Sequence, residues 1–338
     1  MNCPLLTIAI PTFNRNQILA RTLSFLLPQL RPECEVIIID NASPVPVRET
    51  IGAILESVQI SRIELVRNSV NVGGNANIVR CVELCRTKWL WILGDDDTPR
   101  PGAVDAILEL IAGAAESSVL SFTSDMTEYK DQITTTGRSG LCIAIAHAFG
   151  NLLFVSTNVY NATKLRKYIG FGYEYCHSNA PHLAMLLMSI EEHSTCQLLP
   201  QQIVDRGLPR PGDHWSMYWH LLTIGTLLDL PLKSPERMAL QSAINNALFS
   251  YRGLLSQSIL YALKSGDKEA ALHIFGQIAC RLLGAKPSLL ARMKLAGLRL
   301  ALENLWLTRP VAEVAFKKRT GRSLSDRSGE MAMAKTKL

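Results

Sequence analysis

The sequence predicts an α/β fold, an open sheet covered by helices, in roughly the first 125 residues. Short apolar runs alternate there with stretches of helical periodicity, and the run at 36–39 suits a strand that is buried on both faces. Polar residues directly follow three of the apolar runs. Ligands of open α/β sheets lie beyond the carboxyl ends of the strands, so these three ends are expected to share one ligand. The alternative is that they are ordinary polar loops.

The expected elements follow one another at regular intervals. Strands are expected at 6–10, 35–40, 63–66, 89–93 and 119–123, where apolar and β-branched residues cluster. Helices are expected at 17–30, 47–57, 75–86 and 101–114. Asn14 or Asn16 is expected to cap the first helix, and Pro101 fits the first turn of the fourth.

Beyond the first α/β part, the patterns are mainly helical. The uncharged stretch 139–163 contains Gly140, His147 and Asn151, which favours a buried core segment over a membrane span. A helix is expected at 183–190, a loop at 206–214 and helices from 235 onward. The predicted organisation is a catalytic domain at 1–233, a basic helical region at 234–322 and a disordered tail at 323–338.

Composition limits the compartment and the partners. The eight cysteines form no Cys-x-x-Cys pair and the start shows no signal peptide, which favours a reducing, cytoplasmic location. The formal net charge is +6, and residues 281–322 hold ten Lys or Arg against two Glu. With Arg292 and Arg299 on one face, the helix at 288–307 is expected to pack against the domain with peripheral contact to an anionic membrane. Nucleic-acid binding is not expected, because aromatic and basic residues are not interleaved.

Three adjacent carboxylates, Asp95, Asp96 and Asp97, follow the fourth expected strand. Their mutual repulsion calls for a cation, and hard oxygen ligands beside phosphates suit Mg²⁺ or Mn²⁺. The structural alternative is that Asp97 caps the helix after Pro101, but a cap needs one aspartate rather than three. The cluster therefore predicts a divalent-metal site.

Four sequence motifs occur in order within the first 105 residues. They are Ile-Ala-Ile-Pro-Thr-Phe-Asn-Arg at 8–15, Val-Ile-Ile-Ile-Asp-Asn-Ala-Ser at 36–43, Arg-Asn-Ser-Val-Asn-Val-Gly-Gly at 67–74 and Trp-Leu-Trp-Ile-Leu-Gly-Asp-Asp-Asp at 89–97. Together they resemble the family 2 glycosyltransferases, which have the GT-A fold, a Rossmann-like open sheet for nucleoside-diphospho-sugars. The Leu-Gly-Asp-Asp-Asp form is similar to bacterial transferases of lipopolysaccharide O-antigen assembly, the abequosyltransferase-like group.

The resemblance implies how the donor, a UDP-, dTDP-, CDP- or GDP-sugar, is held. Asp40 would accept a hydrogen bond from the ring N–H of a uracil or thymine, Asp96 would contact the ribose and Asp97 the metal. Asp95 would complete the Asp-x-Asp pattern beside the metal. The other donor-binding candidates lie in the strand-end loops: Pro11, Thr12, Asn14, Arg15, Asn71, Gly74 and Asn75.

The carboxylate that activates the acceptor is not evident in the sequence. Family 2 enzymes that invert the anomeric centre need such a base, usually from a Glu-Asp pair that this chain lacks. Glu174, His182 and Asp213 are the candidates, and His214 is a candidate for completing the metal shell. The alternatives are a solvated loop residue for Glu174 and a packed residue at a helix start for His182.

The sequence thus predicts a metal-dependent, inverting glycosyltransferase with a C-terminal helical appendage. Its acceptor would be a saccharide or a lipid-linked saccharide, in bacterial surface polysaccharide assembly. A nucleotidyltransferase is a rival, but it would carry a Gly-rich basic loop after the first strand, where this chain has Pro-Thr-Phe-Asn-Arg. A nucleotide-sugar-binding protein without transfer also fits, because the base is unmatched.

Overall fold

The computed structural model describes residues 4–56, 63–207, 223–248 and 289–304, with 269, 272–273, 310 and 314. The chain divides into two compact units, residues 1–213 with 227–243 and residues 214–226 with 244–338. Each unit is described by itself. The predicted domain boundaries at 233 and 322 stay predictions.

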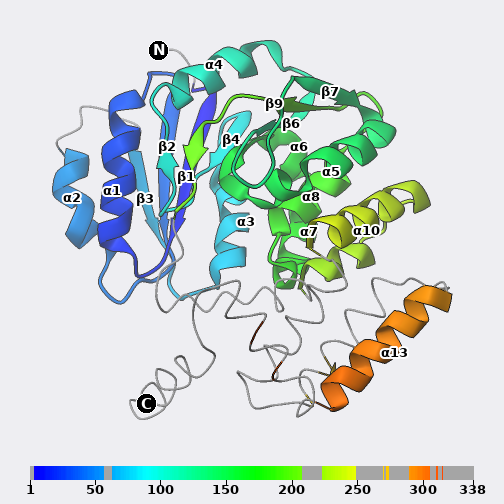
Figure 1. The fold of residues 1–338 in the computed structure, drawn as a ribbon. Coiled ribbons are helices and arrows are strands. Elements are labelled where there is room, and N and C mark those ends of the chain that lie inside the picture. Colours follow the sequence, from blue (N-terminus) through cyan, green and yellow to red (C-terminus); the bar gives the residue numbers. More distant parts are fainter. Residues whose placement is uncertain are drawn as a thin grey trace, which may run out of the picture. The chain divides into compact units, whose positions relative to one another are not determined.

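The first unit contains an eight-stranded sheet of order β3-β2-β1-β4-β8-β6-β9-β7 (Figure 1). The first four strands in this order run parallel, whereas β8 is antiparallel to both of its neighbours, β4 and β6. The fifth expected strand, now β6, is therefore not beside β4, because β8 lies between them. The strands are β1 (Leu6–Thr12), β2 (Cys34–Asp40), β3 (Ile63–Arg67), β4 (Trp89–Ile92), β6 (Ser117–Phe122), β7 (Ile133–Thr136), β8 (Asn158–Asn161) and β9 (Thr195–Leu199).

Two short strands form a separate antiparallel pair beside the aspartates. They are β5 (Thr98–Pro99) and β10 (Val204–Asp205). The pair is strengthened by Arg100, whose Nε and Nη2 donate to Asp205 Oδ1 at 2.9 and 2.7 Å. Residues about a hundred positions apart are thereby joined next to the loop at 94–97.

Helices cover both faces of the sheet, which explains why its central strands β1 and β4 are mostly apolar and almost fully buried. Alternate residues of β1 and β4, such as Ile8 and Trp91, pack with α1, α2 and α4 in one buried cluster. The helix α3 contacts β1 and β2. The helices are α1 (Asn16–Leu26), η1 (Leu27–Gln29), α2 (Val47–Glu56), α3 (Gly74–Leu84), α4 (Ala103–Gly113), α5 (Gly137–Leu153), η2 (Val155–Thr157), α6 (Ala162–Arg166), α7 (Ile169–Glu174), η3 (Cys176–Ser178), α8 (Pro181–Ser189), η4 (Gly225–Asp229), α10 (Ser234–Leu248) and α13 (Leu289–Glu303).

The expected cap of the first helix is wrong, and Pro101 precedes the fourth helix instead of lying in its first turn. The N-cap residue of α1 is Arg15, and the Asn16 side chain instead donates to Val45 O and Thr50 Oγ1. The helix α4 begins at Ala103 after Gly102, which has a φ of 79° that favours glycine. Asp97 is therefore not the cap of this helix, and its burial has another cause.

The uncharged stretch at 139–163 is a core segment, as expected. It comprises most of α5, then η2 and β8, and the four residues of β8 are all buried. No helix in the described part of the chain is long and apolar enough to cross a membrane.

In the second unit, α13 is the long described helix. Leu289, Met293 and Leu300 on it are 73%, 64% and 63% exposed. Their spacing of four and seven residues puts them on one helix face. Arg299 pairs with Glu303 at 2.9 Å, so this helix carries both an exposed apolar face and ionic groups.

Candidate functional site

The carboxyl ends of β1, β2 and β4 meet at one edge of the sheet, as the sequence predicts. Thr12 pairs with Asp40 in the register of β1 and β2, and β4 lies on the other side of β1. The Thr12 hydroxyl donates to Asp95 Oδ2 at 2.7 Å. A strand end from one motif thus touches the aspartate loop from another.

Arg15 bridges two of the three aspartates. Its Nη1 lies 3.2 Å from Asp95 Oδ1 and 3.1 Å from Asp96 Oδ2. Burial raises the pKa of Asp95, although the hydrogen bond from Thr12 and the charge of Arg15 oppose that rise. Thr22 on α1 donates to the carbonyl of Asp95 at 2.8 Å and fixes the backbone of the loop.

Asp97 is held on both carboxylate oxygens and is only 5% exposed. Ser156 Oγ donates to its Oδ2 at 2.5 Å, and the Gly207 N–H donates to its Oδ1 at 2.9 Å. Ser156 Oγ also accepts from Gly94 N at 2.9 Å, so it ties both ends of the loop together. Burial raises the pKa of Asp97 to about 6, and the charges of Asp96 and Asp95 add to that rise.

Gly207 fits this position because it has no side chain. A Cβ there would lie 2.6 Å from the Asp96 carbonyl oxygen and 3.0 Å from Asp96 Cγ. The segment that follows β10 therefore packs directly on the aspartate loop. Close approach of backbone to a functional loop is a usual reason for glycine.

Asp40 is buried and ionised at the end of β2. The Ser43 N–H donates to its Oδ1 at 2.8 Å, the Val47 N–H donates to its Oδ2 at 3.3 Å and Arg67 pairs with Oδ2. Burial raises the pKa of Asp40, but the hydrogen bonds from Ser43, Val47 and Arg67 outweigh it and lower the pKa overall. The guanidinium of Arg67 is 41% exposed, so it presents a positive charge above a buried carboxylate.

Four asparagines fasten the loop between β3 and α3 to the end of β2. Asn41 Nδ2 donates to Asn71 Oδ1 at 2.8 Å, and Asn41 Oδ1 accepts from Asn68 Nδ2 at 2.9 Å and from Val72 N at 3.0 Å. Asn68 Nδ2 also donates to Asn77 Oδ1 at 3.0 Å. The network fixes a loop whose backbone at Gly74 is exposed, with open space where a Cβ would lie.

Pro11, Asn14 and Asn75 complete the predicted donor-binding set. Pro11 is half-buried within β1, and Asn14 has a φ of 53° and donates its N–H to Ser43 Oγ at 2.8 Å. The Asn75 side chain turns toward η3 and donates to Cys176 O and to Asn179 Oδ1, both at 2.8 Å. The loop at the start of α3 is therefore linked to the stretch that contains Glu174.

The candidates for the catalytic base have different surroundings. Glu174 is exposed at the end of α7, and its carboxylate has no hydrogen bond or ion pair with the described residues. His182 is 2% exposed, its Nε2 lies 3.1 Å from Leu152 O, and burial lowers its pKa to about 4. Those surroundings match a packed residue at a helix start. Asp213 and His214 lie outside the described residues.

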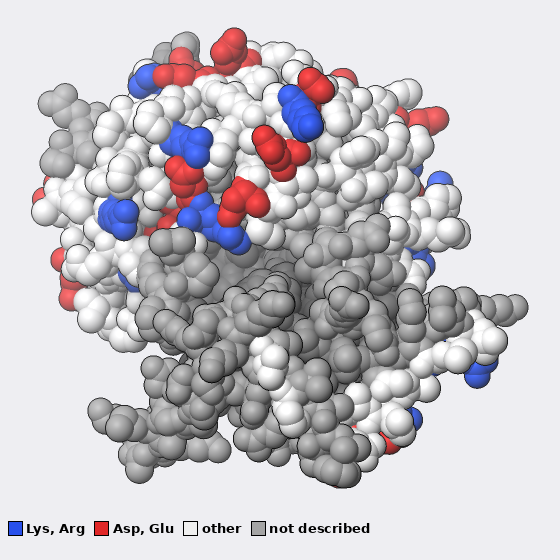
Figure 2. Space-filling view, viewed as in Figure 1, with Lys and Arg blue, Asp and Glu red and all other residues white. Residues whose placement is uncertain are grey.

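Charges of both signs are mixed on the face of the molecule in Figure 2. Within the described residues, the ion pairs of the aspartate loop all come from Arg15, and no three His, Cys, Asp or Glu side chains converge as a metal site would need. Asp95 and Asp96 share one guanidinium, and Asp97 pairs with no cation among the described residues. Their hard oxygen atoms fit a divalent cation such as Mg²⁺ or Mn²⁺.

Sequence reasoning missed Arg67, Ser43, Ser156 and Gly207. Arg67 stands at the first position of a quoted motif and pairs with Asp40 in the register of β3 and β2, so its place at a strand end was the available signal. Ser156 and Gly207 are far from the aspartates in sequence and carry no local motif. Only the fold brings them to Asp97.

The chain is similar to known proteins over its first half. Residues 7–155 match the model of glycosyl transferase family 2. Abequosyltransferase RfbV of Salmonella typhimurium is 34% identical over 95 residues, which are 28% of each chain. The putative colanic acid biosynthesis glycosyl transferase WcaA of Escherichia coli is 28% identical over 107 residues, 32% of this chain and 38% of that one. The matched part is thus well under half of either relative's length.

Solved structures show the same fold at low identity. Residues 1–349 of S. aureus TarS in complex with UDP-GlcNAc superpose with a TM-score of 0.58 at 15% identity, covering 90% of this chain and 92% of that one. The mannosyltransferase PcManGT of Pyrobaculum calidifontis, in complex with GDP-Man and Mn²⁺, gives 0.53 at 15% identity, with 96% and 89% covered. The central sheet has the GT-A fold, and residues 7–155 are the part of the chain that resembles glycosyl transferase family 2.

Proposed function

We propose that this protein transfers a sugar from a nucleoside-diphosphate donor to a saccharide or lipid-linked acceptor, with inversion at the anomeric carbon. The observation that carries the proposal is the convergence of Thr12, Arg15 and the three aspartates at one sheet edge of a family 2 domain. The names of RfbV and WcaA support a role in bacterial surface polysaccharide assembly.

A divalent cation, Mg²⁺ or Mn²⁺, would be held by Asp97 with Asp95, and His214 would complete the shell. Bound there, the ion would supply positive charge to the leaving nucleoside diphosphate. Asp96, whose side chain is 28% exposed, would contact the ribose. Arg15 would share its charge between these carboxylates and the diphosphate, because a guanidinium pairs well with either oxyanion.

The nucleobase would lie against Asp40 and Arg67. Both carboxylate oxygens of Asp40 already accept hydrogen bonds, so Arg67 offers the more accessible polar group at this end. Asn71 and Gly74 would line the loop over the nucleotide. The open space around Gly74 permits close approach of a ligand to the backbone.

The base would be Glu174 or Asp213. Glu174 is exposed and its stretch is hydrogen-bonded to Asn75 at the start of α3, which favours a position near the acceptor. The exposed apolar face of α13, with Arg292 and Arg299 beside it, supports peripheral contact with the cytoplasmic face of an anionic membrane. A lipid-linked acceptor would be reached there.

The test is a binding screen of UDP-, dTDP-, CDP- and GDP-sugars, with and without Mn²⁺, on the wild type and on Asp97→Ala. We expect one donor to bind more tightly with Mn²⁺ and the Asp97→Ala variant to lose that gain. Asp105→Ala is the matched control, because Asp105 is an exposed aspartate on α4 paired with Arg31. If no donor binds, or if Asp97→Ala behaves like Asp105→Ala, the proposal is wrong.

Turnover separates transfer from binding alone. Glu174→Gln and Asp213→Asn are compared at equal donor occupancy. Loss of transfer in one of them, with donor affinity kept, would identify the base. Donor binding without transfer to any saccharide or lipid-linked acceptor would instead point to a binding protein.

A further inference from the structure

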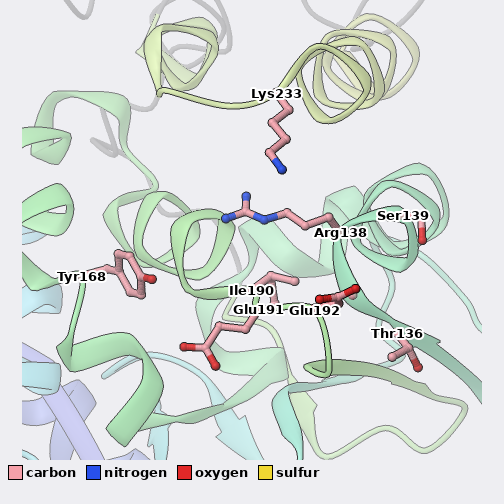
Figure 3. Close-up of a pocket in the computed structure, with 9 residues that line it drawn as sticks. Thr136, Arg138, Ser139, Tyr168, Ile190, Glu191, Glu192 and Lys233 are labelled. Atoms are coloured by element: carbon pink, nitrogen blue, oxygen red, sulfur yellow. The ribbon is translucent and has the colours of Figure 1, made fainter.

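A polar hollow of about 660 Å³ lies in the first unit, where β7 passes into α5 (Figure 3). Thr136, the last residue of β7, pairs with Thr195 at the amino end of β9. The strand β9 is parallel to β6, and both β6 and β4 are antiparallel to β8. The hollow is therefore at the opposite end of the sheet from the aspartate loop, and its volume is in the range of small-ligand sites.

One wall of this hollow has a fixed backbone. Gly137 has a φ of 66°, and a Cβ there would lie 2.7 Å from the Glu192 carbonyl oxygen. Its N–H donates to Ser194 O at 2.8 Å, and the Glu191 N–H donates to Ser194 Oγ at 3.1 Å. The backbone of the turn at 191–194 is thus fixed against the start of α5.

Two cations from different elements line the hollow (Figure 3). Arg138 pairs at 3.4 Å with Glu236, whose side chain is 3% exposed and also accepts from Lys233 N at 2.9 Å. The Lys233 side chain extends toward Arg138 (Figure 3). Among the described residues, the Lys233 ammonium has no hydrogen-bond or ion-pair partner, so it remains available to a ligand.

Acceptor groups and an aromatic ring line the rest of the hollow. Glu191 pairs with Lys167 at 3.4 Å, whereas the Glu192 carboxylate has no hydrogen bond or ion pair within the described residues. Tyr168 is half-buried and lies on the side toward which the Arg138 guanidinium extends (Figure 3). The lining therefore combines strong donors, strong acceptors and one aromatic ring.

We propose that this hollow binds a saccharide. A phosphate or carboxylate is an anion and would be repelled by Glu191 and Glu192, and an ammonium would be repelled by Arg138 and Lys233. A sugar hydroxyl both donates and accepts, so neighbouring hydroxyls satisfy Glu192 and Lys233 together through charge-assisted hydrogen bonds. The ring of Tyr168 can cover the apolar face of a pyranose. Binding here requires no nucleotide and no metal, so the site is separate from the proposed donor site.

The test titrates the full chain with neutral di- to tetrasaccharides of glucose, galactose, mannose and rhamnose, followed by calorimetry and saturation-transfer NMR. Inorganic phosphate and glucosamine serve as the anionic and cationic probes. We expect a neutral saccharide to bind, and Lys233→Ala and Glu192→Ala each to weaken it about tenfold or more. Lys130→Ala and Glu49→Ala are the matched controls, because both residues are exposed and outside the lining.

Three results would overturn the proposal. They are no binding by any saccharide of the panel, binding of phosphate or glucosamine in preference to saccharides, and equal affinities for the pocket variants and the controls. UDP binding with Mn²⁺ is measured on the same variants and is expected to be unchanged. A failure of saccharide binding with UDP binding intact would reject this site alone, and the reverse would reject the proposed donor site alone.

Discussion

Protons should compete with the proposed divalent cation for Asp97. Burial raises the pKa of this carboxyl to about 6, so it is ionised above that pH and protonated below it. A metal binds the ionised form, and the apparent affinity falls as the pH drops through the pKa. With a single group of pKa about 6, Mn²⁺ binding should be weakened about elevenfold near pH 5 and hardly at all near pH 7.5.

The assay is titration of Mn²⁺ by electron paramagnetic resonance in the presence of saturating UDP, between pH 5 and 7.5. Asp95, whose pKa is also raised by burial, changes the affinity in the same direction. Asp97→Asn should bind Mn²⁺ weakly at every pH and lose most of the pH dependence. An affinity that is constant over this range in the wild type, or a pH dependence in Asp97→Asn as steep as that of the wild type, would refute the reasoning.

Three further perturbations test the structure around the site. Burial lowers the pKa of His182 to about 4 in the folded state, below its unfolded value near 6.5. The free energy of unfolding should therefore fall by about 2 kcal/mol as the pH drops from 7.5 to 5, because the unfolded state takes up the proton. In denaturant titrations, His182→Gln should show a smaller fall. Gly207→Ala should displace the segment after β10, lower the free energy of unfolding by about 1–3 kcal/mol and weaken donor binding. Gly170→Ala is the control and should change neither, because a Cβ at Gly170 would meet no atom within 4 Å. Arg67→Met should leave the buried Asp40 short of a partner and destabilise the fold by about 1–3 kcal/mol, with Arg67→Lys recovering part of it; equal stability of Arg67→Met and wild type would contradict this account.

The convergence of Thr12 with the aspartates was predictable from the sequence, because the carboxyl ends of parallel strands lie at the same edge of a sheet. Apolar runs reveal the strands, and the polar residues that follow them must share the carboxyl edge. The contact between Thr12 and Asp95 at 2.7 Å follows from that rule. Local pattern was sufficient here, because each strand and its terminal residues are adjacent in sequence.

The partners of Asp97 could not be predicted in the same way. Ser156 is 59 residues and Gly207 is 110 residues from it, and neither lies in a recognisable motif. Their positions depend on β8, which enters the sheet antiparallel between β4 and β6, and on the pairing of β10 with β5. Such long-range pairing is decided by packing of the whole unit and not by local periodicity.

His182 shows a different limit. A histidine after Pro181 at the start of an apolar helix is compatible with a catalytic role and with a packed position. The sequence pattern is the same in both cases, because α8 is buried nearly all round and has no polar face that would indicate its orientation. Burial in three dimensions, with Leu152 O as the partner, distinguishes the two.

The two groups that hold Asp97 also define how short a working piece of this chain can be. The segment that matches the family model ends at residue 155, one position before Ser156 and well before Gly207. A fragment cut at that limit would keep every motif and yet leave Asp97 without either of its hydrogen-bond donors. During synthesis, the aspartate loop likewise gains its contact with Gly207 only after residue 207 has left the ribosome. The family motifs are complete much earlier in the chain than the geometry that they need.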